Sequence, residues 1–358
     1  YKDAKLFSSD KKAEFGPKFG DGLLYQHHTT SLIFNDPPLH TRVRKIMAGA
    51  LSARAVADME PPMAALVDRL LDAIQAKGEA DLIADLAAPV PIEVIGNLLA
   101  IPHKERSPLR DWSLAILGAL EPAPGLDVLA AGETAVREFL DYLRVLVADR
   151  RKRPGDPSRD VLTRLIQGEQ SGEQLTEIEL LHNVIFILNA GHETTTNLVG
   201  NGLYALLERP EEKVRLLADP SLINTAVEEF LRFESPVQIG NRMVTSGTVV
   251  GGTKMPAGTF VTIGIAAANR DPAEFPDPDT MDIGRFPNRH VAFASGVHFC
   301  VGLNIARMEG RIAIGKFLER LETSPLLTEV TSIDIFRMEK ELRKCSARIS
   351  LNGFLIGG

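Results

Sequence analysis

The segment Glu177–Arg209 constrains the fold most, because it is a single long helical pattern in the middle of the chain. Thr176 is a suitable N-cap for it, and Glu179 is the matching capping-box partner. At a rise of 1.5 Å per residue, such a helix spans about 50 Å. It would cross an entire domain, so both of its faces are expected to be buried. Gly191 and the threonines at 194–196 are weak helix formers, which predicts a local distortion.

Helical periodicity covers most of the chain before this segment, and the pattern changes after Glu234-Ser235-Pro236. Apolar stripes three to four residues apart predict helices over Met59–Ala76 and Ala130–Arg151. The first 35 residues are predicted to be rich in loops, with Gly16, Pro17, Gly20 and Gly22 separating a short charged N-terminal helix from the segment that begins at Leu23. A final helix is predicted from about Gly302 to Leu321. Short strands bounded by Gly and Pro are predicted at Val249–Gly252, Thr259–Ile265 and Ile349–Ile356. The sequence therefore predicts a mainly α fold with small β-sheets.

Composition excludes several classes of protein. The 358 residues carry a formal charge of −7, whereas a nucleic-acid binder would show a basic footprint. Two cysteines cannot form a disulfide framework. No apolar run approaches the ~20 residues of a membrane span. We therefore expect a cytoplasmic protein with no membrane anchor and no nucleic-acid partner. The chain opens at Tyr1 without Met, so an N-terminally incomplete chain is expected.

The strongest chemical motif is Phe293-Ala294-Ser295-Gly296-Val297-His298-Phe299-Cys300-Val301-Gly302, just before the final helix. A cysteine at a helix N-terminus meets free N–H groups and the positive end of the helix dipole, which favour the thiolate. Gly296 and Gly302 allow the backbone to lie close to a flat group. The simplest alternative is a cysteine that packs as a small hydrophobe. A zinc site at His298 and Cys300 lacks the three or four ligands required.

The second motif is Ala190-Gly191-His192-Glu193-Thr194-Thr195, in the middle of the long helix. Its flanks are apolar all round, and a buried carboxylate beside a hydroxyl group indicates a function. An acid and an alcohol at this point can pass protons. A zinc protease is rejected, because its H-E-x-x-H motif requires histidine where this chain has Thr196.

Together the two motifs resemble the haem-binding loop and the oxygen-activation segment of the cytochrome P450 family. The family usually has Gly where this chain has Ala294, and we expect the change to be tolerated. The resemblance covers nearly the whole chain but not the family's N-terminal strands and first helix. It implies one P450 domain over residues 1–358, with haem b between the long central helix and the helix after the cysteine loop. Cys300 would be the axial ligand of the haem iron.

The resemblance implies further residues by motif. His40 and Arg44 match an H-x-x-x-R helix, and with Arg242 and His298 they would hold the haem propionates. The haem-binding set it implies is His40, Arg44, Ala190, Arg242, Phe293, His298, Cys300 and Gly302. The structural set that it implies is Glu229, Arg232 and Arg285, and His290 is also interpreted as structural.

The implied activity is that of a soluble bacterial-type monooxygenase, which inserts one atom of dioxygen into a hydrophobic small molecule by hydroxylation or O-dealkylation. Glu193 and Thr194 would be the catalytic residues and deliver protons. The expected substrate pocket comprises Ala190, Thr194, Val237 and Ile239. The loop 16–34 would cover it, and Ile116–Leu129 would form a mobile lid.

Electrons would come from a separate ferredoxin or flavodoxin-type donor with its reductase, and the protein is expected to be a monomer. The donor would dock on a basic patch comprising Arg42, Lys45, Arg289, Arg307 and Arg311. Two alternatives remain: a peroxide-driven haem enzyme, and a haem-binding or sensor protein without turnover. Neither of them needs the pair Glu193 and Thr194, which favours the monooxygenase.

Overall fold

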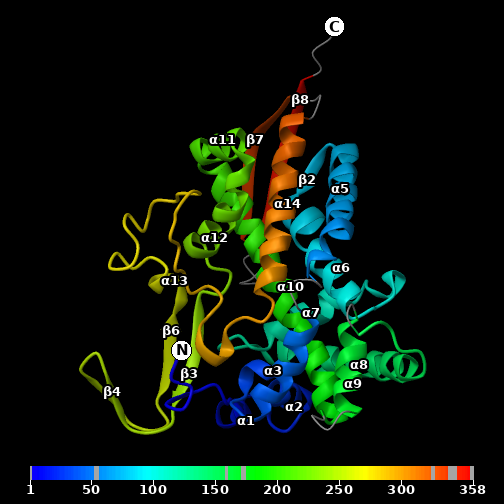
Figure 1. Ribbon diagram of the computed structural model, residues 1–358, viewed down its shortest axis with the longest axis vertical. Helices are drawn as coiled ribbons and strands as arrows, with labels where there is room; N and C mark the ends of the chain where they lie inside the picture. Colours follow the sequence, from blue (N-terminus) through cyan, green and yellow to red (C-terminus); the bar gives the residue numbers. More distant parts are fainter. Residues whose placement is uncertain are drawn as a thin grey trace.

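The computed structural model describes residues 2–51, 56–157, 160–170, 175–323, 327–337 and 345–354. Within these ranges the chain is mainly helical with small antiparallel sheets, as the sequence predicts (Figure 1). The helices are α1 (Lys12–Phe19), α2 (Leu23–Thr30), α3 (Leu39–Ala50), α5 (Glu60–Lys77), α6 (Pro89–Leu98), α7 (Leu109–Gly118), α8 (Leu126–Lys152), α9 (Val161–Gln170), α10 (Glu177–Leu207), α11 (Pro210–Ala218), α12 (Ile223–Phe233), α13 (Ile265–Ala268) and α14 (Leu303–Thr323). The strands are β1 (Phe7–Ser8), β2 (Glu79–Asp81), β3 (Ile239–Val244), β4 (Thr248–Val250), β5 (Thr253–Met255), β6 (Phe260–Gly264), β7 (Leu327–Arg337) and β8 (Cys345–Phe354).

The central helix α10 begins with the predicted capping box. The Thr176 hydroxyl accepts a hydrogen bond from the Glu179 N–H, and the Glu179 carboxylate accepts one from the Thr176 N–H. The helix then continues through Gly191 and the threonines without interruption. The weak helix formers predicted at this point therefore do not break the helix. The hydroxyls of Thr194 and Thr196 donate to the carbonyls of residues four positions earlier, which satisfies them within the helix.

Close packing around α10 forms the core of the molecule. Figure 1 shows α14 running alongside α10, with α5 and α12 on either side of α14. Gly202 permits this approach, because a Cβ atom there would lie 2.7 Å from Ile314 of α14 and 2.9 Å from Phe230 of α12. Most side chains of α10 are buried, as its length predicts.

Three small sheets complete the fold, in the orders β1-β3-β6, β2-β8-β7 and β4-β5. The three predicted strands correspond to β4, β6 and β8, and Ile356 lies outside the described residues. The other five strands were not predicted. Strand β3 carries Gly240, Asn241 and Arg242 at its centre, which are not typical strand residues, and it is stabilised by antiparallel pairing with β1 and β6.

The prediction of a loop-rich N-terminus is wrong, because α1 and α2 occupy much of residues 12–30. The short charged helix was expected to end before Gly16, but α1 begins at Lys12 and continues through Gly16 and Pro17 to Phe19. Pro17 lies inside α1. Proline is unfavourable there, because it has no backbone N–H to donate and its ring crowds the preceding turn. Aromatic packing compensates: Phe15 and Phe19 contact each other at 5.2 Å between ring centroids, and both contact His28 of α2. Among the described helices, none combines the length and the apolar character that crossing a membrane requires.

Candidate functional site

The cysteine loop places Cys300 three residues before the start of α14. The Cys300 N–H donates to the Phe293 carbonyl at 2.9 Å, which closes the loop on itself. Ala294 and Gly296 both adopt the left-handed backbone conformation, with φ angles of 58° and 71°. Ala294, where the family usually has Gly, therefore carries backbone strain that a glycine would avoid.

The electrostatics of Cys300 differ from the expectation of a stabilised thiolate. Burial raises the pKa of the Cys300 thiol, and the Gly302 N–H, Arg44 and Arg307 offset only part of that effect. The helix N-terminus alone does not ionise the thiol. The free-energy cost of removing a thiolate from water exceeds the stabilisation that these partners provide. A metal cation at the sulfur would supply the missing stabilisation.

Four basic side chains gather beside the cysteine loop. The rings of His40 and His298 lie 4.2 Å apart between centroids. Burial, together with the nearby His40, Arg242 and Arg44, lowers the pKa of His298 to about 3. Both ring nitrogens of His40 and the Nε2 of His298 are buried without a hydrogen-bond partner. Such a cluster of donors with orphaned polar atoms fits the carboxylates of a bound group.

Exposed apolar surface near the cluster fits the body of the same group. Ala190 is exposed in the middle of α10, most of whose residues are buried. Val297 and Phe299, on either side of His298, are 37% and 41% exposed. A Cβ atom added to Gly302 would meet no atom within 4 Å. A thiol, apolar walls, a glycine facing open space and a cationic edge together match the chemistry of haem b.

The acid–alcohol pair lies on α10 beside Ala190. Glu193 is partly buried, and burial raises its pKa. The Thr194 hydroxyl donates to the Ala190 carbonyl at 2.8 Å. A carboxyl group whose pKa rises toward neutrality is suited to exchanging protons at physiological pH. Val237 and Ile239, the other expected pocket residues, are exposed at 40% and 56%.

The residues expected to be structural form one cluster around the fully buried pair Glu229 and Arg232. Arg232 makes a bidentate ion pair with Glu229 at 2.8 and 2.7 Å, and both side chains are completely buried. Arg285 donates to the same carboxylate at 3.3 Å, and Asn288 donates to it at 3.0 Å. Arg232 also donates to the carbonyl of Asn269. The cluster thereby fixes the coil between α13 and the cysteine loop. Asn269 and Asn288 were missed, because no motif distinguishes an asparagine in coil.

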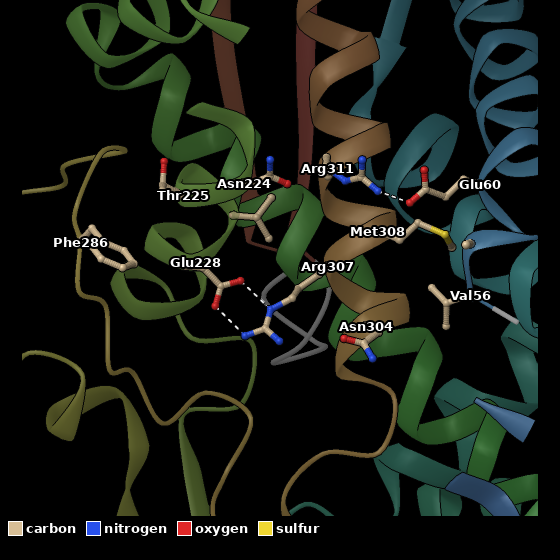
Figure 2. Close-up of a pocket in the computed structure, with 12 residues that line it drawn as sticks. Val56, Glu60, Asn224, Thr225, Glu228, Phe286, Asn304, Arg307, Met308 and Arg311 are labelled. Atoms are coloured by element: carbon tan, nitrogen blue, oxygen red, sulfur yellow. Dashed lines mark hydrogen bonds and ion pairs between the residues drawn. The ribbon is translucent and has the colours of Figure 1, made fainter. Parts of the chain in front are cut away.

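The predicted basic patch is compensated by acidic residues. A cavity of about 500 Å³ opens at the N-terminal part of α14, and Arg307 and Arg311 line it (Figure 2). Figure 2 shows both arginines paired, Arg307 with Glu228 and Arg311 with Glu60. Other pairs in the patch are Arg42–Glu179 and Arg289–Glu274. The patch is therefore a mosaic of charges rather than a uniformly positive surface.

Arg307 has a structural environment that the sequence did not reveal. Its guanidinium lies over the Phe293 ring at 4.9 Å, and it donates twice to Glu228. Burial raises the pKa of Glu228, but hydrogen bonds from His290 and Arg307 outweigh this and lower it to about 2. His290 thus joins α12 to the cysteine loop, which agrees with its interpretation as structural.

Two buried polar contacts of α10 were also missed. The Thr195 hydroxyl donates to Glu309 of α14 at 3.0 Å. His192 lies 3.3 Å from the Ser113 hydroxyl of α7, and burial lowers its pKa to about 4. Neither Glu309 nor Ser113 stands in a recognisable motif, so only the packing of the helices reveals them.

Comparison with known proteins agrees with this geometry. The family model described as Cytochrome P450 matches residues 128–343. Cytochrome P450 107B1 of Saccharopolyspora erythraea is 39% identical over 319 residues, which cover 89% of this chain and 74% of that protein. Vitamin D(3) 25-hydroxylase of Pseudonocardia autotrophica is 39% identical over 296 residues, 82% of this chain and 71% of that protein.

Solved structures give the same result for the fold. The crystal structure of P450BioI in complex with an acyl carrier protein ligated to hexadec-9Z-enoic acid matches with a TM-score of 0.87 and 30% identity. The match covers 98% of this chain and 88% of that chain. The extent and identity of these matches show that this chain belongs to the cytochrome P450 family of haem b-dependent monooxygenases.

Proposed function

We propose that this P450 hydroxylates or O-dealkylates a lipophilic small molecule at a pocket formed by Ala190, Thr194, Val237 and Ile239. The observation that carries the proposal is that Ala190, Val237 and Ile239 are exposed although all three are apolar. Two of the proteins compared above support a lipophilic substrate. One is named for the hydroxylation of vitamin D(3), and the other was crystallised with a long-chain acyl group.

Cys300 is the proposed axial ligand of the haem iron. Haem held by this cysteine would supply the activation of dioxygen, and a thiolate ligand would favour it by donating electron density. His40, Arg44, Arg242 and His298 bind the propionates in this proposal. The orphaned nitrogens of the two histidines support that role, because a carboxylate would satisfy them.

Glu193 and Thr194 are the proposed route for protons. Burial raises the pKa of Glu193, which helps this carboxyl to take up a proton from solvent and release it again. The Thr194 hydroxyl is held by the Ala190 carbonyl, and its oxygen remains able to accept a hydrogen bond. The pair would thus deliver protons at the site of oxygen reduction and keep the reductant coupled to product.

The electron donor is proposed to be a separate ferredoxin or flavodoxin-type protein that docks near the N-terminal part of α14. The exposed side chain of Arg289 lies in the coil just before the cysteine loop. The cavity beside Arg307 lies at α14, just after this loop. The charge mosaic there favours a partner whose own charges alternate, rather than one that is attracted only by net charge.

Turnover with different oxidants tests the proposal. A library of lipophilic compounds is first screened for a change in haem spin state, and product is then measured with reductant and dioxygen or with peroxide alone. The proposal requires product with reductant and a donor protein. Product with peroxide only would identify a peroxide-driven enzyme, and absence of product from every spectroscopic binder would favour a haem-binding or sensor protein.

A further inference from the structure

Glu309 is a fully buried carboxyl group to which the proposed reaction assigns no role. It lies in the second turn of α14 and is 2% exposed. Its Oε2 atom accepts a hydrogen bond of 3.0 Å from the hydroxyl of Thr195, which is also 2% exposed. Thr195 directly follows Thr194. This contact therefore joins the helix that starts at the cysteine loop to the turn of α10 that carries the acid–alcohol pair.

The three neighbouring threonines use their hydroxyls differently. Those of Thr194 and Thr196 donate to carbonyls within α10 itself. The hydroxyl of Thr195 instead donates to a different helix, across the line where Gly310 of α14 approaches Leu198 of α10. The bond to Glu309 thus fixes the rotation and position of this turn relative to α14.

The acidic and basic groups around α14 are paired with one another rather than with Glu309. The pairs formed by α12, α5 and α6, the other helices packed on α14, are Glu228–Arg307, Glu229–Arg232, Glu60–Arg311, Asp68–Lys316, Asp72–Arg320 and Glu93–Arg106. On α10, the titratable neighbours of Thr195 are His192 and Glu193. No basic group among the described residues contributes to the shift in the pKa of Glu309.

A buried carboxylate without a cation is unfavourable, and such a group keeps its proton instead. Burial accordingly raises the pKa of Glu309 to about 8, although the hydrogen bond from Thr195 opposes the shift. At neutral pH the side chain is therefore a neutral carboxylic acid, which tolerates its dry surroundings. Once ionised, it would draw water or a cation into the contact between α10 and α14.

We propose that Glu309 is a positioning residue: as a neutral acid it holds the Glu193–Thr194 turn in place through Thr195, and its ionisation at alkaline pH loosens that turn. The inference rests on the proposed role of Glu193 and Thr194 in proton delivery. It predicts that the fraction of reductant converted to product falls above about pH 8, while binding of haem is retained.

The first test measures the protonation of Glu309 without turnover. Urea unfolding midpoints of the haem-loaded protein are compared between pH 5.5 and 7.5 for wild type, Glu309→Gln and the exposed control Glu319→Gln. The folded carboxyl keeps its proton while the unfolded chain, with an ordinary pKa of 4.5, releases it. Wild type should therefore lose stability as pH rises, by up to about tenfold in the unfolding equilibrium constant per pH unit relative to Glu309→Gln.

The control Glu319→Gln should follow wild type, because this side chain is exposed on α14 and its substitution leaves the buried Glu309–Thr195 contact intact. Parallel pH dependences for wild type and Glu309→Gln would overturn the proposal. This measurement reports the protonation state of Glu309 even if the protein has another activity. Failure of the proposed function would therefore not be mistaken for failure of the inference.

The second test measures coupling, the ratio of product to reductant consumed, at pH 7.5 and 9. With a pKa of about 8, the neutral fraction of Glu309 falls about eightfold over this interval, and the coupling of wild type should fall by up to that factor. Glu309→Gln should show no such fall, because glutamine stays neutral and still accepts the hydrogen bond. Thr195→Val should be poorly coupled at both values. An equal fall in wild type and Glu309→Gln would contradict the proposed role.

Discussion

The strained backbone at Ala294 gives a prediction whose size follows from the structure. Its φ of 58° is the left-handed conformation, which costs an L-residue about 1–2 kcal/mol relative to glycine. Replacing Ala294 by glycine removes this cost but increases the entropy of the unfolded chain, worth about 0.5–1 kcal/mol in the opposite direction. The methyl group is only partly buried, so little packing is lost. We expect Ala294→Gly to be stabilised by about 0.5 kcal/mol.

A matched variant isolates the strain from the entropy. Ala73 is exposed in the middle of α5, with ordinary helical geometry, and Ala73→Gly should destabilise by about 1 kcal/mol. The two variants share the same change in the unfolded chain, so their difference of about 1–2 kcal/mol measures the strain itself. Ala100, with a φ of 49°, provides a second strained site away from the cysteine loop.

The assay is urea unfolding of the haem-loaded protein, with the midpoint and slope of each variant compared. Ala294→Gly and Ala100→Gly should unfold at higher urea than Ala73→Gly, with slopes equal to wild type. The reasoning would be refuted if Ala294→Gly were destabilised as much as Ala73→Gly, because the left-handed backbone would then carry no strain.

Three further predictions concern the candidate site. Thr194→Val should fold and bind haem normally but lower the product formed per reductant by about tenfold and release peroxide, and full coupling in this variant would exclude the acid–alcohol mechanism. Gly302→Ala should leave unfolding of the haem-free protein unchanged, because its Cβ would meet no atom within 4 Å, yet weaken haem binding measured by titration; an unchanged haem affinity would show that the group does not approach this residue. Arg289→Glu should slow reduction by the donor about two- to fivefold at low salt, as expected for an exposed charge, without altering substrate affinity; equal rates for wild type and variant at low salt would place the docking surface elsewhere.

Arg307→Glu, by contrast, would not be a clean test of donor docking. The sequence presents Arg307 as one of several basic residues near the cysteine loop. In the structure it donates twice to Glu228 and covers Phe293. A glutamate in its place would face Glu228 directly, so any loss of electron transfer would be mixed with loss of structure.

Local patterns in the sequence predicted much of the helical framework. The long helix was expected at Glu177–Arg209 and is found at Glu177–Leu207, because its capping box and apolar content are both local properties. The strand β3 was not predicted, since its pairing with β1 joins segments distant in sequence. The extent of α1 was not predicted, because Gly16 and Pro17 favour a break where the structure continues the helix. Strand β3 is held by β1 and β6, and α1 by aromatic contacts with α2.

The same distinction between local patterns and contacts formed on folding applies to the candidate site. Cys300, Glu193 and Thr194 stand in motifs whose spacing indicates the chemistry proposed for them. The Glu309–Thr195 contact comes from two helices packed side by side, and a glutamate within a helix ordinarily faces solvent. The strain at Ala294 was also hidden, because a backbone angle is set by the folded loop and not by the residue alone.

The ferrous–CO absorption spectrum tests the central claim, that the Cys300 thiolate ligates the haem iron. A thiolate opposite CO shifts the Soret band strongly to the red, whereas a histidine or a neutral thiol does not. Wild type and Cys345→Ser should both show the shifted band, because the sequence around Cys345 resembles no ligand loop. Cys300→Ser should lose it. A red-shifted band that survives in Cys300→Ser would contradict the assignment.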